Sequence, residues 1–293
     1  MLANITGIKR FAIHDGDGIR STVFFKGCSL NCIWCHNPEN IKRETELAFF
    51  KNNCVFCGAC MHVCDCHKVS NSEHIINKQN CKNRGKCVNV CNHNALELFG
   101  KLVSTDDICK TLFEDKPFYE VSDGGITLSG GECLLQPEAS AEILKASKHN
   151  GINTAVDTAG FVQKASIDAV LPYTDIFLYD IKAIDEDVHI KCTGRSNKII
   201  LDNLKYIDSL NKSIEIRIPY VPGYNSDQME KIAAFIKPLK NIRSVRLLKY
   251  HKLSGNKAEA IGDNRKYPEK LPTDEEILKA KGVLELSNKK IVI

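Results

Sequence analysis

Three cysteines lie close together in the segment Gly-Cys-Ser-Leu-Asn-Cys-Ile-Trp-Cys-His-Asn-Pro at residues 27–38. Cys28, Cys32 and Cys35 are spaced so that one loop can fold over a face of a metal cluster. A cubic 4Fe–4S cluster takes four protein ligands, so three thiolates leave one iron open to a small molecule. An open iron favours catalysis over electron storage. The alternatives are a zinc site that His36 completes, or a structural turn.

A second group of cysteines lies within residues 49–98, a cysteine-rich and irregular segment. Its first run has the two-two-three spacing of a bacterial ferredoxin, and its second run repeats that spacing with Arg84 where a cysteine would stand. In such ferredoxins the fourth cysteine of each run ligates the other cluster. The spacing therefore predicts a first cluster on Cys54, Cys57, Cys60 and Cys91.

The second cluster of this segment lacks one obvious ligand. Its predicted ligands are Cys64, Cys81 and Cys87, and Cys66 is the nearest candidate for the fourth. A three-iron cluster and a weakly held cluster are alternatives. A zinc-binding insert is the remaining interpretation, although zinc sites prefer separated pairs of cysteines.

Composition limits the class of protein. The chain has 293 residues, 43% of them hydrophobic and 26% charged, as in ordinary globular proteins. Its net charge is +4 and no basic block occurs, which argues against nucleic acid as a partner. No apolar run is long enough for a signal peptide or a membrane span, so we expect a cytoplasmic protein. Eleven of the fourteen cysteines lie between residues 28 and 91, which favours metal binding over disulfides.

Outside the cysteine-rich segment, strand and helix patterns alternate. Strands are expected at 21–26, 125–129, 153–157, 175–180, 213–218 and 244–249, and helices at 138–149, 164–171, 197–210, 226–239 and 274–288. Alternation of this kind predicts a parallel sheet covered by helices. We predict an α/β fold, a partial (β/α)6 TIM-like barrel of residues 1–48 and 99–293, with a ferredoxin-like insert at 49–98. A doubly wound sheet is the alternative.

Polar residues lie at or just after the carboxyl ends of five predicted strands, and Arg217 lies within its strand. They are Gly130-Gly131-Glu132, Asp157, Asp180 with Lys182, Arg217 and His251. Ligands of parallel α/β folds bind at the carboxyl ends of strands, and the cysteine loop also follows a strand. Together these residues suit a zwitterionic amino acid, since Glu132 can accept from an ammonium group while Lys182 and Arg217 pair with a carboxylate. The two aspartates suit a small cation or ribose hydroxyls.

The chain resembles the radical S-adenosylmethionine (SAM) enzymes, and more narrowly the glycyl-radical-enzyme activating enzymes. The resemblance runs over nearly the whole chain, through 14–20, the three cysteines, 130–132, 157–158, 180–182, 217–223 and 250–251. The cysteine triad marks the superfamily, and residues 14–20 with 34–38 mark the activating enzymes. The double-cluster insert is typical of the larger ones. Asp17 and Cys133 depart from the family pattern, which puts local turns in doubt.

This resemblance implies that SAM chelates the open iron of the Cys28–Cys32–Cys35 cluster. It places a monovalent cation at Asp157 and Asp180 and gives three 4Fe–4S clusters in all, one catalytic and two in the insert. The residues expected to contact SAM are Trp34, Cys35, His36, Gly130, Gly131, Glu132, Asp157, Asp180, Ile181, Lys182, Arg217 and His251.

The implied reaction is reductive cleavage of SAM to methionine and a 5′-deoxyadenosyl radical, which abstracts hydrogen from a backbone glycine of a partner glycyl radical enzyme. A flavodoxin or ferredoxin would supply the electron, through insert clusters that act as a relay or as a docking element. A monomer is expected, because another protein's loop must enter the site. The alternatives are a radical SAM enzyme that modifies a small molecule or peptide directly, and a non-catalytic electron-transfer protein.

Overall fold

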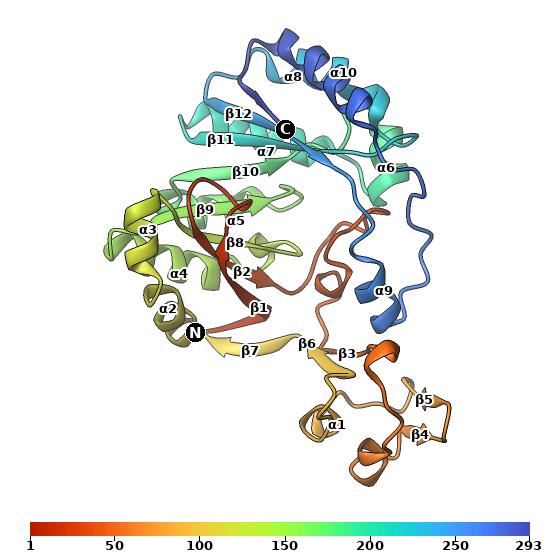
Figure 1. The fold of residues 1–293 in the computed structure, drawn as a ribbon. Helices are drawn as coiled ribbons and strands as arrows, with labels where there is room; N and C mark the ends of the chain where they lie inside the picture. Colours follow the sequence, from red (N-terminus) through yellow and green to blue (C-terminus); the bar gives the residue numbers. More distant parts are fainter.

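A computed structural model describes residues 1–293, which fold around one nine-stranded mixed sheet (Figure 1). In the order in which they hydrogen-bond, its strands are β13 (Ile291–Val292), β12 (Ile242–Lys249), β11 (Ser213–Tyr220), β10 (Ile176–Asp180), β9 (Asn153–Thr158), β8 (Gly125–Gly130), β2 (Arg20–Phe25), β1 (Leu2–Ala12) and β7 (Lys101–Ser104). The sheet is open, with β13 and β7 as its edges.

The parallel part of the sheet confirms the six predicted strands. β2 and β8 to β12 pair in chain order, and the order never reverses. A doubly wound sheet needs such a reversal, so that alternative is wrong. The interior of the sheet is apolar because its strands carry runs of buried branched residues, as Ile214, Ile216 and Ile218 show on β11.

Two antiparallel strands extend the sheet beyond the prediction. β1 pairs with β2 through Ile5↔Phe25 and with β7 through Leu2↔Ser104. The connection between these two strands is short, because β1 runs to Ala12 and β2 begins at Arg20.

Helices follow the parallel strands as expected from the alternation. The predicted helices correspond to α4 (Pro137–His149), α5 (Lys164–Val170), α7 (Lys198–Ser209), α8 (Met229–Ile236) and α10 (Asp274–Leu284), while α2 (Thr105–Phe113), α3 (Lys116–Ser122), α6 (Glu186–Thr193) and α9 (Gly255–Ile261) were not predicted. α10 begins at a capping box in which Thr273 and Glu276 exchange side-chain to backbone hydrogen bonds. No helix is long and apolar enough to cross a membrane.

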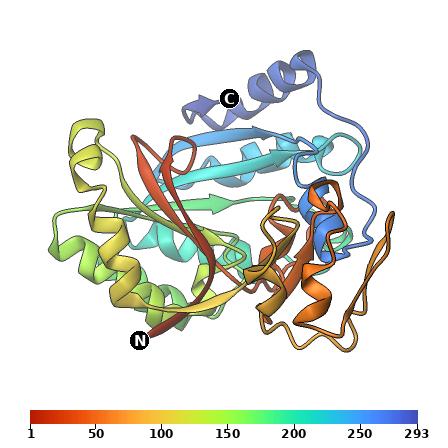
Figure 2. The same cartoon turned by 60° about the horizontal axis from the view of Figure 1, so that its bottom comes forward.

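The cysteine-rich segment projects from the sheet through a two-stranded neck (Figures 1 and 2). This neck pairs β3 (Glu46–Phe49) with β6 (Leu96–Phe99). Beyond it lie a small hairpin of β4 (His67–Val69) and β5 (His74–Ile76) and the single-turn helix α1 (Lys86–Asn89). The segment has its own small apolar cluster, which includes Leu47, Leu96 and several cysteines.

Candidate functional site

A cleft of about 510 Å³ opens at the carboxyl ends of the parallel strands. These ends point toward the side of the sheet where the cysteine loop and α9 lie (Figure 2). Most of the residues expected to contact SAM line this cleft: Trp34, Cys35, His36, Gly130, Gly131, Asp157, Asp180, Lys182, Arg217 and His251. The other two cysteines of the loop, Cys28 and Cys32, line it as well. The fold thus brings these residues together from six separate segments of the chain.

The glycine pair fixes the cysteine loop to the sheet. Gly130 has φ +113°, and a Cβ there would lie 2.3 Å from the backbone of Phe25. A Cβ on Gly131 would lie 2.3 Å from the carbonyl oxygen of Gly27, at the base of the loop. The Glu132 N–H also donates to that carbonyl oxygen at 2.8 Å. Glycine is required here because two backbone segments approach each other where a side chain would collide.

Cys28, Cys32 and Cys35 lie in the wall of the cleft, where Cys32 is buried and the other two are half-buried. Burial raises the pKa of all three, and that of Cys35 reaches about 12. Buried thiols resist ionisation unless a cation compensates the thiolate, and metal coordination deprotonates a thiol outright. This donor set therefore fits a metal cluster, whose positive irons supply the missing compensation.

Two carboxylates and two cations form another part of the cleft wall. The Lys182 ammonium lies 2.6 Å from Oδ2 of Asp180, and Nη1 of Arg217 lies 3.6 Å from Oδ1 of Asp157. Burial raises the pKa of Asp157 to about 6, and the nearby Asp180 carboxylate acts in the same direction while Arg217 opposes it. Ser129 donates a hydrogen bond to Asp157 at 2.6 Å. The wall is a near-neutral set of charges that can pair with both ends of a zwitterion.

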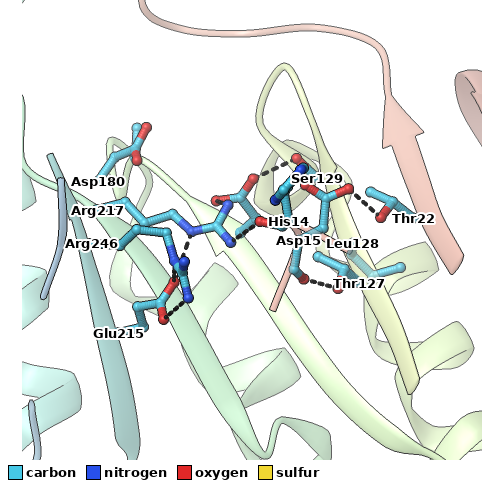
Figure 3. A network of polar contacts seen from close by, with 12 residues as sticks. His14, Asp15, Thr22, Thr127, Leu128, Ser129, Asp180, Glu215, Arg217 and Arg246 are labelled. Carbon is cyan, nitrogen blue, oxygen red and sulfur yellow. Dashed lines mark hydrogen bonds and ion pairs between the residues drawn. The ribbon is translucent and has the colours of Figure 1, made fainter. Parts of the chain in front are cut away.

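Arg217 is held at the centre of this set (Figure 3). It is 5% exposed, its Nη2 donates to the carbonyl oxygen of His14 at 2.9 Å, and its Nε lies 3.3 Å from Glu215. Arg246 donates to both oxygens of the same carboxylate, from Nε to Oε1 at 3.0 Å and from Nη2 to Oε2 at 3.2 Å. The buried carboxylate thus orients Arg217 from behind, and the guanidinium reaches the cleft.

Glu132 and Ile181 do not line the cleft. The Glu132 carboxylate, 2% exposed, accepts hydrogen bonds from the Thr158 hydroxyl at 2.7 Å and the Ala159 N–H at 3.1 Å. Those donors belong to the neighbouring strand end, so Glu132 ties two strand ends together. Ile181 is 1% exposed, and its N–H donates to the carbonyl oxygen of Arg217 at 2.9 Å.

Burial raises the pKa of Glu132 to about 7, against 4.5 for an ordinary glutamate. Below pH 4.5 the Glu132 carboxyl group is protonated in both the folded and the unfolded chain. Between pH 4.5 and 7 the unfolded chain releases the proton first, so rising pH destabilises the fold, by up to about 3 kcal/mol across this range. Glu132→Gln has no such group. As the pH rises from 5.5 to 7, the free energy of unfolding of Glu132→Gln should therefore increase by about 2 kcal/mol relative to that of the native chain.

Denaturant unfolding at a series of pH values checks this expectation. Parallel pH curves for the native chain and Glu132→Gln would show that the buried carboxyl does not change its protonation in this range.

Aromatic side chains form the third part of the cleft. The rings of His36 and His251 stack with centroids 4.0 Å apart at 12°, and Tyr250 continues the stack behind His36. Nε2 of His36 is buried without a hydrogen-bond partner. A flat stack with one unpaired nitrogen suits a heteroaromatic ring that brings its own hydrogen-bonding groups.

Sequence reasoning missed Arg265, which supports the cysteine loop from outside. Its Nη1 donates to the carbonyl oxygen of Cys32 at 3.1 Å and to Asn31 at 2.6 Å, while Asp263 holds the guanidinium. Arg265 stands in an irregular segment after α9 with no motif around it. No local pattern signals its contact with residues more than 230 positions away.

The two departures from the family pattern are accommodated locally. Asp17 pairs with Arg243 at 2.6 Å on the surface. Cys133 is fully buried, and its Sγ lies 3.6 Å from the carbonyl oxygen of Leu128. Neither residue occupies the cleft.

Comparison with known proteins identifies the family. The sequence pattern of the Radical SAM superfamily matches residues 51–236. The chain is 42% identical to the trans-4-hydroxy-L-proline dehydratase activating enzyme of Clostridioides difficile, over 97% of this chain and 96% of the relative. It is 38% identical to the choline trimethylamine-lyase activating enzyme of Oleidesulfovibrio alaskensis, over 89% and 87%. The chain belongs to the radical SAM superfamily, among the glycyl-radical-enzyme activating enzymes.

A solved structure supports the same assignment. A domain of pyruvate-formate lyase-activating enzyme from Bacteroides vulgatus aligns with a TM-score of 0.50 and 29% identity, covering 58% of this chain and 98% of that domain. The partner of an activating enzyme is a glycyl radical enzyme, so this chain acts on another protein.

In this activating enzyme the insert cysteines surround two further cavities. One is lined by Cys54, Cys57, Cys60 and Cys91. The other, of about 370 Å³, is lined by Cys64, Cys66, Cys81 and Cys87. The fold therefore sorts the eight cysteines into the same two groups as the sequence prediction, with Cys66 beside the three predicted ligands of the second group.

Proposed function

We propose that this activating enzyme binds SAM in the cleft, cleaves it reductively, and removes a hydrogen atom from a backbone glycine of its partner enzyme. The observation that carries the proposal is the convergence of three cysteine thiols, a zwitterion-sized set of charges and an aromatic stack in one cleft. These parts match the iron cluster, the amino-acid end and the adenine of SAM, respectively.

Each part of the cleft then has a separate role. Cys28, Cys32 and Cys35 hold the catalytic cluster. Lys182 and Arg217 pair with the SAM carboxylate, and the backbone at the glycine pair lies beside its ammonium group. When bound, the cluster supplies one electron to the sulfonium, which yields methionine and the 5′-deoxyadenosyl radical.

The remaining residues orient the nucleoside and the loop that carries the glycine pair. His36, His251 and Trp34 contact the adenosine, and the unpaired Nε2 of His36 faces a hydrogen-bonding ring. Asp157 and Asp180 ligate a monovalent cation beside the SAM carboxylate. Glu132 contributes by positioning, since its carboxylate bonds protein groups and leaves the ammonium to the backbone.

The open sheet suits entry of a protein loop. We propose that the sheet and its helices form a partial barrel and that the enzyme acts as a monomer. For the partner we propose a glycyl radical enzyme that dehydrates trans-4-hydroxy-L-proline. The support is 42% identity over nearly the full length of both chains, against 38% over a shorter alignment for the choline relative. Incubation of the reduced enzyme with SAM and each candidate partner, followed by electron paramagnetic resonance (EPR) of the glycyl radical, tests both the activity and this choice.

The insert, residues 49–98, is proposed to hold two 4Fe–4S clusters. The first uses Cys54, Cys57, Cys60 and Cys91. The second uses Cys64, Cys66, Cys81 and Cys87, with Cys66 taking the place left by Arg84. Four cysteines around each cavity support this division, because a cubic cluster takes four protein ligands.

Replacing Cys66 tests the second insert cluster. Cys66→Ser should lower the iron content from about twelve to about eight atoms per chain, because a three-ligand site in a surface cavity holds its cluster weakly. Cys109→Ser is the matched control, since Cys109 is a buried cysteine of α2 that lines neither cavity. Iron analysis after anaerobic reconstitution measures the difference. Full iron content in Cys66→Ser would assign the fourth ligand to another group.

We propose that the insert relays electrons from a flavodoxin or ferredoxin toward the catalytic cluster. Cys57, a ligand of the first cluster, is exposed, and we therefore propose that electrons enter the protein at this cluster.

A further inference from the structure

Two histidines of the insert hairpin, His67 and His74, lie beside the first insert cavity and have no role in the function described above. His74 lines that cavity together with all four proposed ligands of the first cluster. Its Nδ1 lies 3.4 Å from Sγ of Cys54, and its Nε2 lies 2.8 Å from Nδ1 of His67. The inference drawn from this contact rests on the proposed presence of a cluster on the insert cysteines.

The His74 ring is fixed in its orientation. Phe49 packs against it edge to face, with ring centroids 4.5 Å apart at 60°. His67, which holds the other nitrogen, is 4% exposed. A ring held between Phe49 and His67 keeps its Nδ1 directed at Cys54, so the contact does not depend on a free surface side chain.

The direction of each hydrogen bond follows from the state of Cys54. A cysteine that ligates iron is a thiolate and can only accept a hydrogen bond. Nδ1 of His74 must therefore carry a proton and donate it toward Cys54. A neutral imidazole carries one ring proton, so its other ring nitrogen accepts a hydrogen bond. Nε2 of His74 is then an acceptor, and the N–H at Nδ1 of His67 donates a hydrogen bond to it.

A competing contact is weaker. Nε2 of His74 also lies 3.7 Å from Sγ of Cys60, at the long end of sulfur hydrogen bonds. It is already engaged by His67 at 2.8 Å. The shorter contact decides the arrangement, so Cys54 receives the hydrogen bond and Cys60 does not.

We propose that His74 donates a hydrogen bond to the Cys54 ligand of the first insert cluster, with His67 as its positioning residue, and that this pair raises the reduction potential of that cluster. A donor to a ligating sulfur stabilises the reduced cluster, which carries one more negative charge. The first insert cluster therefore accepts an electron from the external donor more readily. It is tuned for entry of the electron into the protein.

A single metal ion is the rival occupant of the same groups. Sγ of Cys60 and ring nitrogens of His67 and His74 all lie within 4.8 Å of one another, a set that fits Zn²⁺ with one open position. Zinc there would remove Cys60 from the first cluster. Metal analysis therefore belongs to the test.

The test is a potentiometric titration followed by EPR on the full-length, anaerobically reconstituted protein. The first-cluster signal is identified as the one missing from Cys57→Ala. His74→Phe should lower its midpoint potential by about 59 mV, a tenfold change in the one-electron reduction equilibrium. His74→Asn keeps an N–H near the position of Nδ1 and should restore most of the loss. His93→Phe is the matched control, because His93 lines the same cavity, whereas the hydrogen bonds to Cys54 and Cys60 come from His74.

Each outcome decides the proposal. An unchanged potential in His74→Phe with an intact cluster overturns the inference and leaves the cluster assignment standing. If His74→Phe fails to hold iron, His67→Leu decides, since it must lower the potential of an intact cluster. Equal iron in Cys57→Ala and the native protein, or one zinc per chain that His74→Phe loses, overturns the inference together with the insert-cluster proposal.

Discussion

Cys32→Ala should abolish the reductive cleavage of SAM, whereas Cys57→Ala should retain it when a chemical reductant is supplied. Cys32 lies in the wall of the cleft beside the charged and aromatic groups, so its loss removes a ligand of the cluster that meets the sulfonium. Cys57 lies in the insert, where it is exposed and lines the first insert cavity. Its loss interrupts the supply of electrons and leaves the cleft intact.

Formation of 5′-deoxyadenosine with dithionite as reductant measures this difference. With a flavodoxin as the only donor, Cys57→Ala should also become inactive. Equal cleavage by the two variants under dithionite would contradict the assignment of separate roles to the two groups of cysteines.

Arg217→Gln should weaken SAM binding by roughly 10-fold to 100-fold, because a hydrogen bond to a charged group contributes about 1.5–3 kcal/mol. The guanidinium is the cation that Glu215 and the His14 carbonyl hold at the cleft wall (Figure 3). Its replacement also leaves Asp157 without its nearest positive charge. Both effects act on the carboxylate end of SAM.

Arg246→Gln is the matched control for this variant. Arg246 bonds the same Glu215 carboxylate at 3.0 Å but does not line the cleft. Equilibrium dialysis of SAM under anaerobic conditions should show its affinity within about threefold of the native protein, a change of less than ~1 kcal/mol. If both variants bound SAM equally well, the carboxylate would have another partner.

The parallel strands could be predicted because each is a short buried run that ends in polar residues. Ile176-Phe177-Leu178-Tyr179 before Asp180 shows this pattern clearly. Parallel strands place their carboxyl ends at one edge, so the polar residues could be assigned to one site without knowledge of their separation. The glycine pair, Asp157, Lys182 and Arg217 were located in this way.

β1 could not be predicted, because its sequence lacks a clear alternation. Gly7 and the exposed pair Lys9 and Arg10 interrupt its apolar positions, and two irregularities break its register with β2. The strand is stabilised by antiparallel pairing with β2 and with β7, about 100 residues away. Such pairing is decided by tertiary contacts rather than by local preference.

The direction of the Glu132 side chain also could not be predicted from the sequence. Its position at a strand end was correct, but Glu132 caps the short 3₁₀ turn Cys133–Leu135 through the N–H of Leu134. That turn rotates the carboxylate behind the strand ends, toward Thr158. The same limit applies to His74 and Arg265, whose partners are fixed only when distant segments pack together.

The most direct measurement follows one hydrogen atom. A partner glycyl radical enzyme labelled with α-deuterated glycine is incubated with the reduced activating enzyme and SAM, and the 5′-deoxyadenosine formed is analysed by mass spectrometry. We predict one deuterium in the product, together with a glycyl radical signal in the partner. Cleavage of SAM that leaves the product unlabelled and the partner without a radical would contradict this account.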